Sequence, residues 1–183
     1  YGITRERFWS HSLKAATASA IAADRLGLSS LRCEAFTAGL VHDVGMLVVD
    51  SHLVANHESI GFGEPAFSVS TLERQALGYD HTEAGAMLAR HWGFPDQLIA
   101  AIQFHHEMDM GCPHRDLVRA VTAGNVLAQV VDEEIEVDSN DFVRSTLAGL
   151  AFDQAFLEQL RLDLSCNLEE TLARATRPAT VMI

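Results

Sequence analysis

The chain has 183 residues, of which 48% are hydrophobic and 21% charged, which fits one globular domain with a real core and excludes a disordered chain. The formal net charge of −12 argues against nucleic acid as a partner, because a broadly acidic surface repels phosphate backbones. No apolar run is long enough for a membrane span, and no signal peptide precedes the first helical pattern.

The cysteines predict a reducing compartment. Cys33, Cys112 and Cys166 lie far apart and form no CxxC pair, so we expect no disulfide framework and a cytoplasmic location. The chain opens at Tyr1 and is soon in a helical pattern, so we expect a fragment of a longer protein.

The first helix is predicted over about Arg5 to Leu26, with Gly27 as its stop signal. One stripe of this helix combines a histidine with small residues that let a neighbouring helix approach closely. The stripe consists of His11, Ala15, Ala18 and Ala22. Ser29 or Ser30 is predicted to cap the next helix.

That next helix delivers a histidine and a carboxylate side by side, in the stretch from Ala38 to Gly45. Neighbouring residues on a helix point about 100° apart and rarely share a partner, except where a metal ion lies between them. An imidazole and a carboxylate are good ligands for zinc, ferrous iron or manganese. If His42 and Asp43 bind a metal, further ligands must come from elsewhere in the chain.

The middle of the chain contains loop and cap signals. An apolar segment over about 46–56 is followed by a loop pattern over 61–65. Residues 70–73 read as a capping box that opens a short helix ending at Gly78. Residues 80–83 have a similar spacing and open another helix, with His81 in its first turn.

The second half continues the helical pattern. Gly93 ends one helix, and Pro95 fits the first turn of the next, which runs to the pair His105-His106. A loop over 107–114 precedes a helix from Arg115 to about Val131 that carries Asn125. An acidic stretch over 132–141 and helices over about 142–150 and 154–175 follow. Strand-like alternation is essentially absent, so the predicted fold class is all-α.

The order of these residues resembles the HD superfamily of metal-dependent phosphohydrolases, and more closely its HDOD and HD-GYP branches in bacterial signalling. The motifs that carry the resemblance are Phe8-Trp9-Ser10-His11-Ser12, the Ala38 to Gly45 stretch, Asp80-His81-Thr82-Glu83-Ala84-Gly85, Trp92-Gly93-Phe94-Pro95 and His105-His106. The Phe-Trp pair and the Trp-Gly-Phe-Pro turn are more similar to HDOD. The resemblance covers about residues 5–129 of a single domain over 1–183, which also has a helical C-terminal tail.

The resemblance implies a helical bundle with a metal centre between its helices, holding one or two ions of iron, manganese or zinc. His11, His42 and Asp43 would hold one ion, and Asp43 would bridge to a second. The second would be held by His81, His105 and His106. The family's last ligand is an aspartate, and the matching position here is Asn125.

Two further differences from the family's motifs concern residues that would contact a substrate. The family's HD-x-GK motif would place a phosphate-contacting lysine where this chain has Met46, and residues 107–111 lack the Gly-Tyr-Pro element of HD-GYP enzymes. These losses favour an output or regulatory domain, whose partner would be a signalling protein or a small phosphorylated ligand. The alternative is a working phosphohydrolase acting on a nucleotide or cyclic dinucleotide.

Several residues keep alternative interpretations. The histidine series can also be a set of buried, hydrogen-bonded side chains without a metal, and His105-His106 can be a helix C-terminus that favours imidazolium. Asp132, seven residues after Asn125, can replace the missing ligand. His52, His57, His91 and His114 are expected at the surface or in loops. The apolar tail stripe of Phe152, Phe156, Leu160 and Leu164 is expected to be core or a partner surface.

Overall fold

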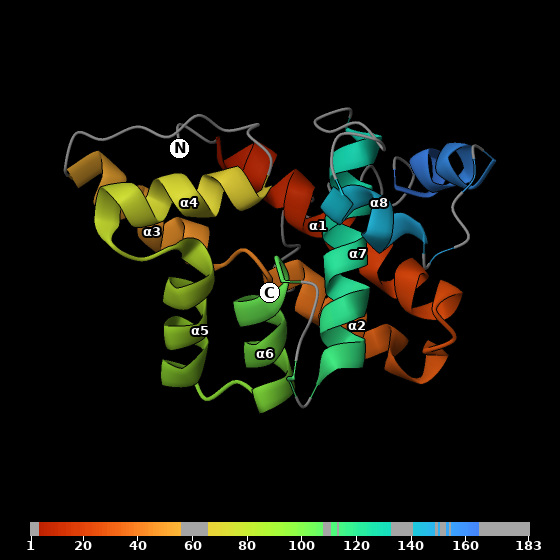
Figure 1. Ribbon diagram of the computed structural model, residues 1–183, viewed down its shortest axis with the longest axis horizontal. Coiled ribbons are helices and arrows are strands. Elements are labelled where there is room, and N and C mark those ends of the chain that lie inside the picture. The colour runs from red at the N-terminus through yellow and green to blue at the C-terminus, as the bar shows by residue number, and fades with distance from the viewer. Residues whose placement is uncertain are drawn as a thin grey trace, which may run out of the picture.

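The computed structural model describes residues 4–55, 66–107, 111–112, 114–132, 141–148, 150, 153 and 155–164. All regular secondary structure in these residues is helical, which confirms the all-α prediction (Figure 1). The helices are α1 (Arg5–Arg25), a 3-10 turn (Ser29–Leu31), α2 (Arg32–Val41), α3 (Gly45–Ala55), α4 (Ala66–Leu77), α5 (His81–His91), α6 (Asp96–Phe104), α7 (Arg115–Val131) and α8 (Asp141–Ala148). Residues 155–164 are also helical.

Helix α1 forms the centre of the bundle with α2 and α7, and close backbone contact holds the three together. A Cβ atom added to Gly39 of α2 would lie 2.5 Å from Ser19 Oγ, and one added to Gly124 of α7 would lie 2.2 Å from the same oxygen. The predicted small-residue stripe of α1 faces this contact, since Ala15, Ala18 and Ala22 are fully buried. The expectation of close helix approach is therefore confirmed.

Helices α3, α4, α5 and α6 build the other side of the molecule (Figure 1). Met46, Val49 and Leu53 of α3 pack with side chains of α4 and α5 in one apolar cluster. Helix α6 packs against α5 and α7 and so joins this side to the centre. The space between α1, the α2–α3 turn, α5 and α6 is where the histidines converge.

The predicted glycine stops are confirmed. Gly27, Gly78 and Gly93 have φ of +74°, +83° and +72°, the left-handed conformation that a glycine adopts without steric cost. Asp80 caps α5 as expected, because its carboxylate accepts hydrogen bonds from the backbone N–H groups of Thr82 and Glu83.

Two predicted helix starts are wrong. Ser29 and Ser30 lie in the 3-10 turn, and neither provides a side-chain cap for α2. Helix α4 begins at Ala66, so the apparent capping box over 70–73 lies inside a helix. Packing of α4 against α3 and α5 overrides the local cap signal, and Glu73 is used elsewhere.

The tail packs on the central helices. Phe156, Leu160 and Leu164 are buried against residues of α1, α7 and α8, so this part of the predicted stripe is core. Phe152, the loop over 61–65, the acidic residues 133–140 and residues 165–175 of the predicted last helix lie outside the described residues. Among the helices that the structure describes, none combines the length and hydropathy needed to cross a bilayer.

Candidate metal centre

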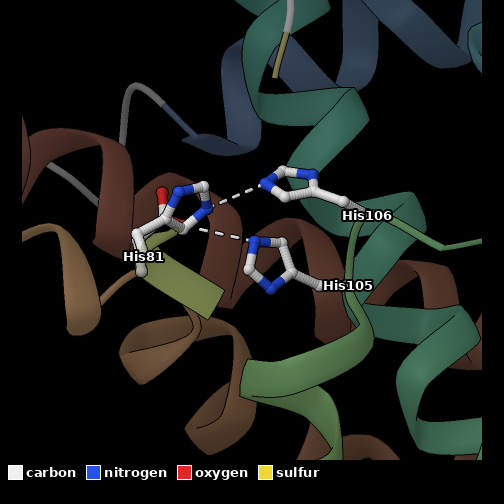
Figure 2. A group of neighbouring side chains, drawn as sticks. His81, His105 and His106 are labelled. Atoms are coloured by element: carbon white, nitrogen blue, oxygen red, sulfur yellow. Dashed lines mark hydrogen bonds and ion pairs between the residues drawn. The ribbon is translucent and has the colours of Figure 1, made fainter. Parts of the chain in front are cut away.

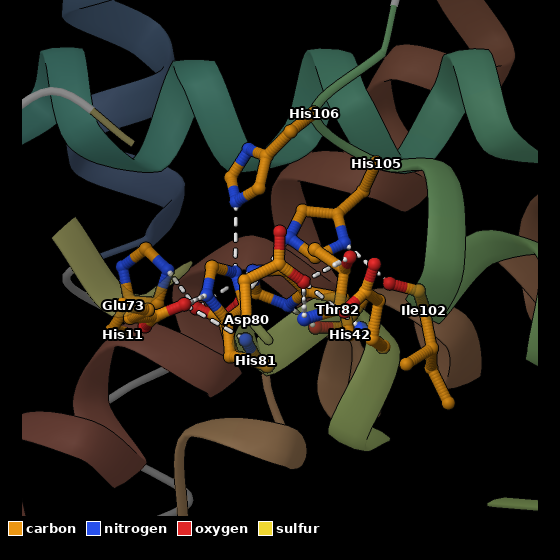
Figure 3. A network of polar contacts seen from close by, with 12 residues as sticks. His11, His42, Glu73, Asp80, His81, Thr82, Ile102, His105 and His106 are labelled. Atoms are coloured by element: carbon orange, nitrogen blue, oxygen red, sulfur yellow. Dashed lines mark hydrogen bonds and ion pairs between the residues drawn. The ribbon is translucent and has the colours of Figure 1, made fainter. Parts of the chain in front are cut away.

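Two groups of potential ligands meet at one carboxylate. The first group is His11, His42 and Asp43, and the second is Asp43, His81, His105 and His106. Within each group the ligand atoms lie within 4.8 Å of one another. His11 comes from α1, the His42-Asp43 pair from the turn between α2 and α3, His81 from the first residue of α5, and the last pair from the end of α6 (Figure 3).

Asp43 presents a different oxygen to each group. Its Oδ2 lies 3.2 Å from His42 Nε2 and 3.6 Å from His11 Nε2. Its Oδ1 lies 3.3 Å from His105 Nε2 and 3.6 Å from His81 Nε2. The Nε2 atoms of His81 and His106 are 3.0 Å apart (Figure 2). A carboxylate placed between two sets of imidazoles in this way can bridge two cations.

These separations fit atoms that share an ion. At bond lengths of about 2.0–2.1 Å, ligand atoms lie about 3.3–3.4 Å apart in a tetrahedral site and about 2.9 Å apart in an octahedral one. The contacts in the cluster run from 3.0 to 3.6 Å. The donor set of imidazole and carboxylate therefore fits a divalent first-row metal in both chemistry and spacing.

The histidine tautomers support the same conclusion. His42 Nδ1 lies 2.7 Å from the carbonyl oxygen of Gly39, and His105 Nδ1 lies 2.9 Å from that of Ile102. A carbonyl only accepts, so both Nδ1 atoms carry the hydrogen and both neutral rings direct an Nε2 lone pair toward Asp43. Both Nε2 atoms and Asp43 Oδ1 are buried without a hydrogen bond. A metal ion between these acceptors would remove the conflict, and in the metal-free protein a proton on His42 Nε2 would relieve it on the His42 side.

Glu73 of α4 is a site residue that the sequence interpretation missed. Its side chain is fully buried, and Oε2 accepts hydrogen bonds from His81 Nδ1 at 2.7 Å and from the His81 backbone N–H at 2.8 Å. A glutamate eight residues before a histidine, across a helix break, has no local pattern to reveal it. The buried contact appears only when α4 folds back on the start of α5.

Asp43 holds a negative charge inside the cluster. Burial alone would raise its pKa, but the close imidazoles of His42 and His105 hold the pKa well below its usual value. Burial likewise acts against charged imidazoles at His42 and His81. For these two rings the nearby carboxylates outweigh burial and raise the pKa above 6.5.

The other two histidines of the second group behave in the opposite way. Burial lowers the pKa of His105 to about 4, even though Asp43 acts to raise it. Burial and the neighbouring His105 hold the pKa of His106 well below its usual value. Both rings are therefore neutral near pH 7, the state in which an imidazole binds a metal.

Of the other sequence candidates, Asp132 and the remaining described histidines lie outside the two groups, which consist of histidines and one carboxylate. Asn125 of α7 is buried, and its Oδ1 accepts no hydrogen bond, which leaves a carbonyl oxygen open to a cation. Asp132 caps the end of α7 and pairs with Lys14, so it does not replace the missing ligand. His52 and His91 are exposed as expected, His114 is partly buried, and His57 lies outside the described residues.

Met46, at the position where the resemblance would place a phosphate-contacting lysine, is an apolar core residue. It is 7% exposed and packs with Val49, Leu53, Val69 and Ala84. The chain therefore provides no cationic side chain at this position beside the cluster.

A helical bundle that buries a His-Asp dipeptide among histidines from three other helices has the HD-type fold of the phosphohydrolase-related proteins. Residues 1–108, more than half of the chain, match the HDOD domain family, and the protein belongs to that family. The resemblance drawn from the sequence motifs is thereby confirmed.

Known proteins are similar over most of the chain. A Ribonuclease Y from Pseudothermotoga lettingae is 32% identical over 114 residues, which are 62% of this chain and 17% of that protein. The crystal structure of a putative phosphohydrolase from Shewanella amazonensis SB2B is 27% identical with a TM-score of 0.61, covering 92% of this chain and 63% of that one. The MmoQ response regulator from Methylococcus capsulatus shares the fold at 24% identity and a TM-score of 0.58, covering 84% and 60%. The chain thus spans less than two thirds of each relative.

Proposed function

We propose that this chain is an HDOD-type regulatory domain of a bacterial signalling protein, which binds one or two divalent ions and transmits a signal without efficient hydrolysis. One observation carries the proposal. The chain retains the buried, Asp43-centred cluster, whereas the position of the phosphate-contacting lysine is occupied by the core residue Met46. Loss of substrate chemistry with retention of the cluster is what a regulatory descendant of an enzyme requires.

Iron, manganese or zinc would be held by the two groups that share Asp43. His11 and His42, with the carbonyl of Asn125 as a neutral additional ligand, would hold one ion, and His81, His105 and His106 the other. A bound ion supplies Lewis acidity and lowers the pKa of a coordinated water. The residues around the cluster set the position, the tautomer and the charge of the ligand side chains. They also keep bulk water away from the buried ligand atoms.

The signalling role draws support from the similarity to MmoQ, which is named a response regulator. The partner would be another signalling protein or a small phosphorylated ligand in the cytoplasm. We propose neither nucleic acid nor a membrane as a partner, because the chain carries a net charge of −12.

A metal-dependent phosphohydrolase or phosphodiesterase is the second candidate. It is favoured by the complete second group of ligands and by the similarity to a protein named as a putative phosphohydrolase, at 27% identity. Ribonuclease Y, whose name denotes cleavage of RNA, matches over 62% of this chain. The two candidates share a metal site and differ in turnover, so one assay separates them.

We expect protein purified without chelator to contain at least one equivalent of iron, manganese or zinc, and to hydrolyse phosphodiesters poorly. Losing a preorganised charge contact costs roughly a hundredfold or more in rate, so we expect turnover below about 0.1 s⁻¹. The measurement is elemental analysis together with turnover of bis-p-nitrophenyl phosphate and of a cyclic dinucleotide. Turnover above about 1 s⁻¹ would establish the second candidate, and metal below about a tenth of an equivalent after anaerobic loading would refute a metal site.

Metal binding at pH 7 is expected to release protons. The raised pKa values of His42 and His81 mean that, in the metal-free protein at pH 7, these rings are protonated to a greater extent than ordinary histidines, whereas His105, His106 and Asp43 are already deprotonated. A metal ligand must lose its proton, so the release grows as pH falls toward 6.5 and vanishes as pH rises above the raised values. Titration calorimetry of Zn²⁺ in two buffers of different ionisation enthalpy measures the release. An enthalpy independent of buffer at pH 7 would contradict the expectation.

A further inference from the structure

The contact between Glu73 and His81 differs from the contacts that support His42 and His105. Glu73 is fully buried in the second half of α4, and both of its oxygens lie within reach of His81 Nδ1, at 2.7 and 3.0 Å (Figure 3). Its Oε2 also accepts the first backbone N–H of α5. Two N–H donors and the positive end of a helix dipole therefore face the Glu73 carboxylate in a place without solvent.

His81 is therefore supported by a charged acceptor, whereas His42 and His105 are supported by backbone carbonyls. In each case Nδ1 carries the hydrogen and Nε2 faces Asp43. A carboxylate accepts a stronger hydrogen bond than a carbonyl and pushes electron density toward Nε2. Of these three rings, His81 thus has the Nε2 that donates its lone pair to a metal ion most strongly. The orientation of the His81 ring is also the most firmly fixed.

The buried charges also divide unequally between the two groups of ligands. Asp43 is common to both, and Glu73 adds a second carboxylate beside His81. Asp80 also acts on His81, but its ion pair with Arg74 offsets its charge. With neutral histidines, the two carboxylates balance one divalent ion near His81, His105 and His106. A second ion near His11 and His42 would add two positive charges with no further carboxylate in either group to offset them. Burying an uncompensated charge is costly, so the two positions cannot have equal affinity.

We infer that Glu73 is a positioning residue that fixes the tautomer and orientation of His81 and makes the His81, His105, His106 and Asp43 group the tighter of two unequal metal sites. The inference rests on the proposed metal-binding function. Helix α4 contributes no metal ligand, but it would still support the site, because the buried carboxylate of Glu73 binds the first turn of α5 through His81.

The test compares Glu73→Gln with a matched control in metal-free protein reloaded with Zn²⁺. Glutamine keeps the size of Glu73 and removes its charge. Arg74→Gln is the control, because Arg74 also joins α4 to the start of α5, at 2.9 Å from Asp80 Oδ2, but does not contact His81. Competition with a chromophoric chelator gives the dissociation constant of each equivalent, and far-UV circular dichroism verifies folding.

We expect wild-type protein to bind one Zn²⁺ tightly and any second one more weakly. Glu73→Gln should weaken the tight equivalent about 10- to 100-fold, the usual effect of removing a partner of a ligating histidine. Arg74→Gln should change it less than about threefold. Equal loss in both variants would mean that α4 docking alone matters, and no loss in Glu73→Gln would refute the inference. Two equivalents of equal affinity in wild type would also refute it.

A second readout does not depend on metal. Nitrogen-15 NMR of the metal-free protein at alkaline pH, where His81 is neutral, should show hydrogen on Nδ1 in wild type and in Arg74→Gln, and a tautomer mixture in Glu73→Gln. If wild type has the Nδ1–H tautomer but binds no Zn²⁺, the proposed function fails while the positioning contact stands. If Zn²⁺ binds and the tautomer is unchanged by Glu73→Gln, the positioning role is wrong while the metal function stands.

Discussion

Replacing Asp43 by alanine is expected to abolish metal binding at both positions, to less than about a tenth of an equivalent. Each Asp43 oxygen faces a different pair of histidine Nε2 atoms at 3.2 to 3.6 Å, so one substitution removes the shared ligand of both groups. The neutral variant Asp43→Asn keeps the side-chain shape and should lose most of the metal as well, because it removes the negative charge.

In the Asp43→Ala variant, the stability of the folded protein should no longer depend on bound metal. A ligand present at a thousand times its dissociation constant stabilises the folded state by about 4 kcal/mol, and Asp43→Ala removes this contribution. We expect a chelator to lower the melting temperature of wild type and to leave that of Asp43→Ala unchanged. His91→Ala is the control, because His91 is an exposed histidine outside both groups. One full equivalent retained in Asp43→Ala would mean that Asp43 is not the bridge.

Replacing Gly45 by alanine is expected to cause the largest loss of stability among single substitutions near the site. An added Cβ would lie 1.9 Å from the carbonyl oxygen of His81 and 2.5 Å from the backbone nitrogen of Gly85. Both obstacles are backbone atoms of α5, so α3 and α5 must separate. Overpacking of this kind costs roughly 3 kcal/mol or more, and it moves His81 away from Asp43.

The measurement is urea unfolding together with metal content. Gly111→Ala serves as the control, because no atom lies within 4 Å of a Cβ added there and its backbone needs no positive φ. The control should stay within about 0.5 kcal/mol of wild type. If Gly45→Ala is as stable as the control and keeps its metal, the close approach of α3 and α5 does not hold the site together.

Much of the fold followed from local signals in the sequence. Asp80 as a cap and Gly27, Gly78 and Gly93 as stops set helix ends through the hydrogen bonds and φ values of a few neighbouring residues. The alanine stripe of α1 follows from helical periodicity alone. Such interactions depend on residues a few positions apart, so they can be predicted before the tertiary structure is known.

The residue types of the site were also evident from the sequence. The predicted histidines and Asp43 lie within or close to the region that matches the HDOD family, and the structure brings them together into the two groups around Asp43. Their assignment as metal ligands stays a prediction that the metal analysis tests. The grouping itself depends on contacts between α1, the α2–α3 turn, α5 and α6, over tens of residues.

Three features were decided only by the tertiary structure. Glu73 looked like part of a helix cap, and it supports His81 because α4 packs against α5 and brings a buried carboxylate to a ring nitrogen. Met46 looked like a lost phosphate contact, and it is core because α3 turns this side chain toward α4 and α5. Gly45 looked like a break in an apolar run, and it is the point where α3 meets the backbone of α5. The sequence by itself determined which side chains could bind a metal and where most helices end, since both follow from residue chemistry and short-range geometry. Long-range packing alone determined which oxygen of Asp43 faces which histidines and which carboxylate lies behind His81.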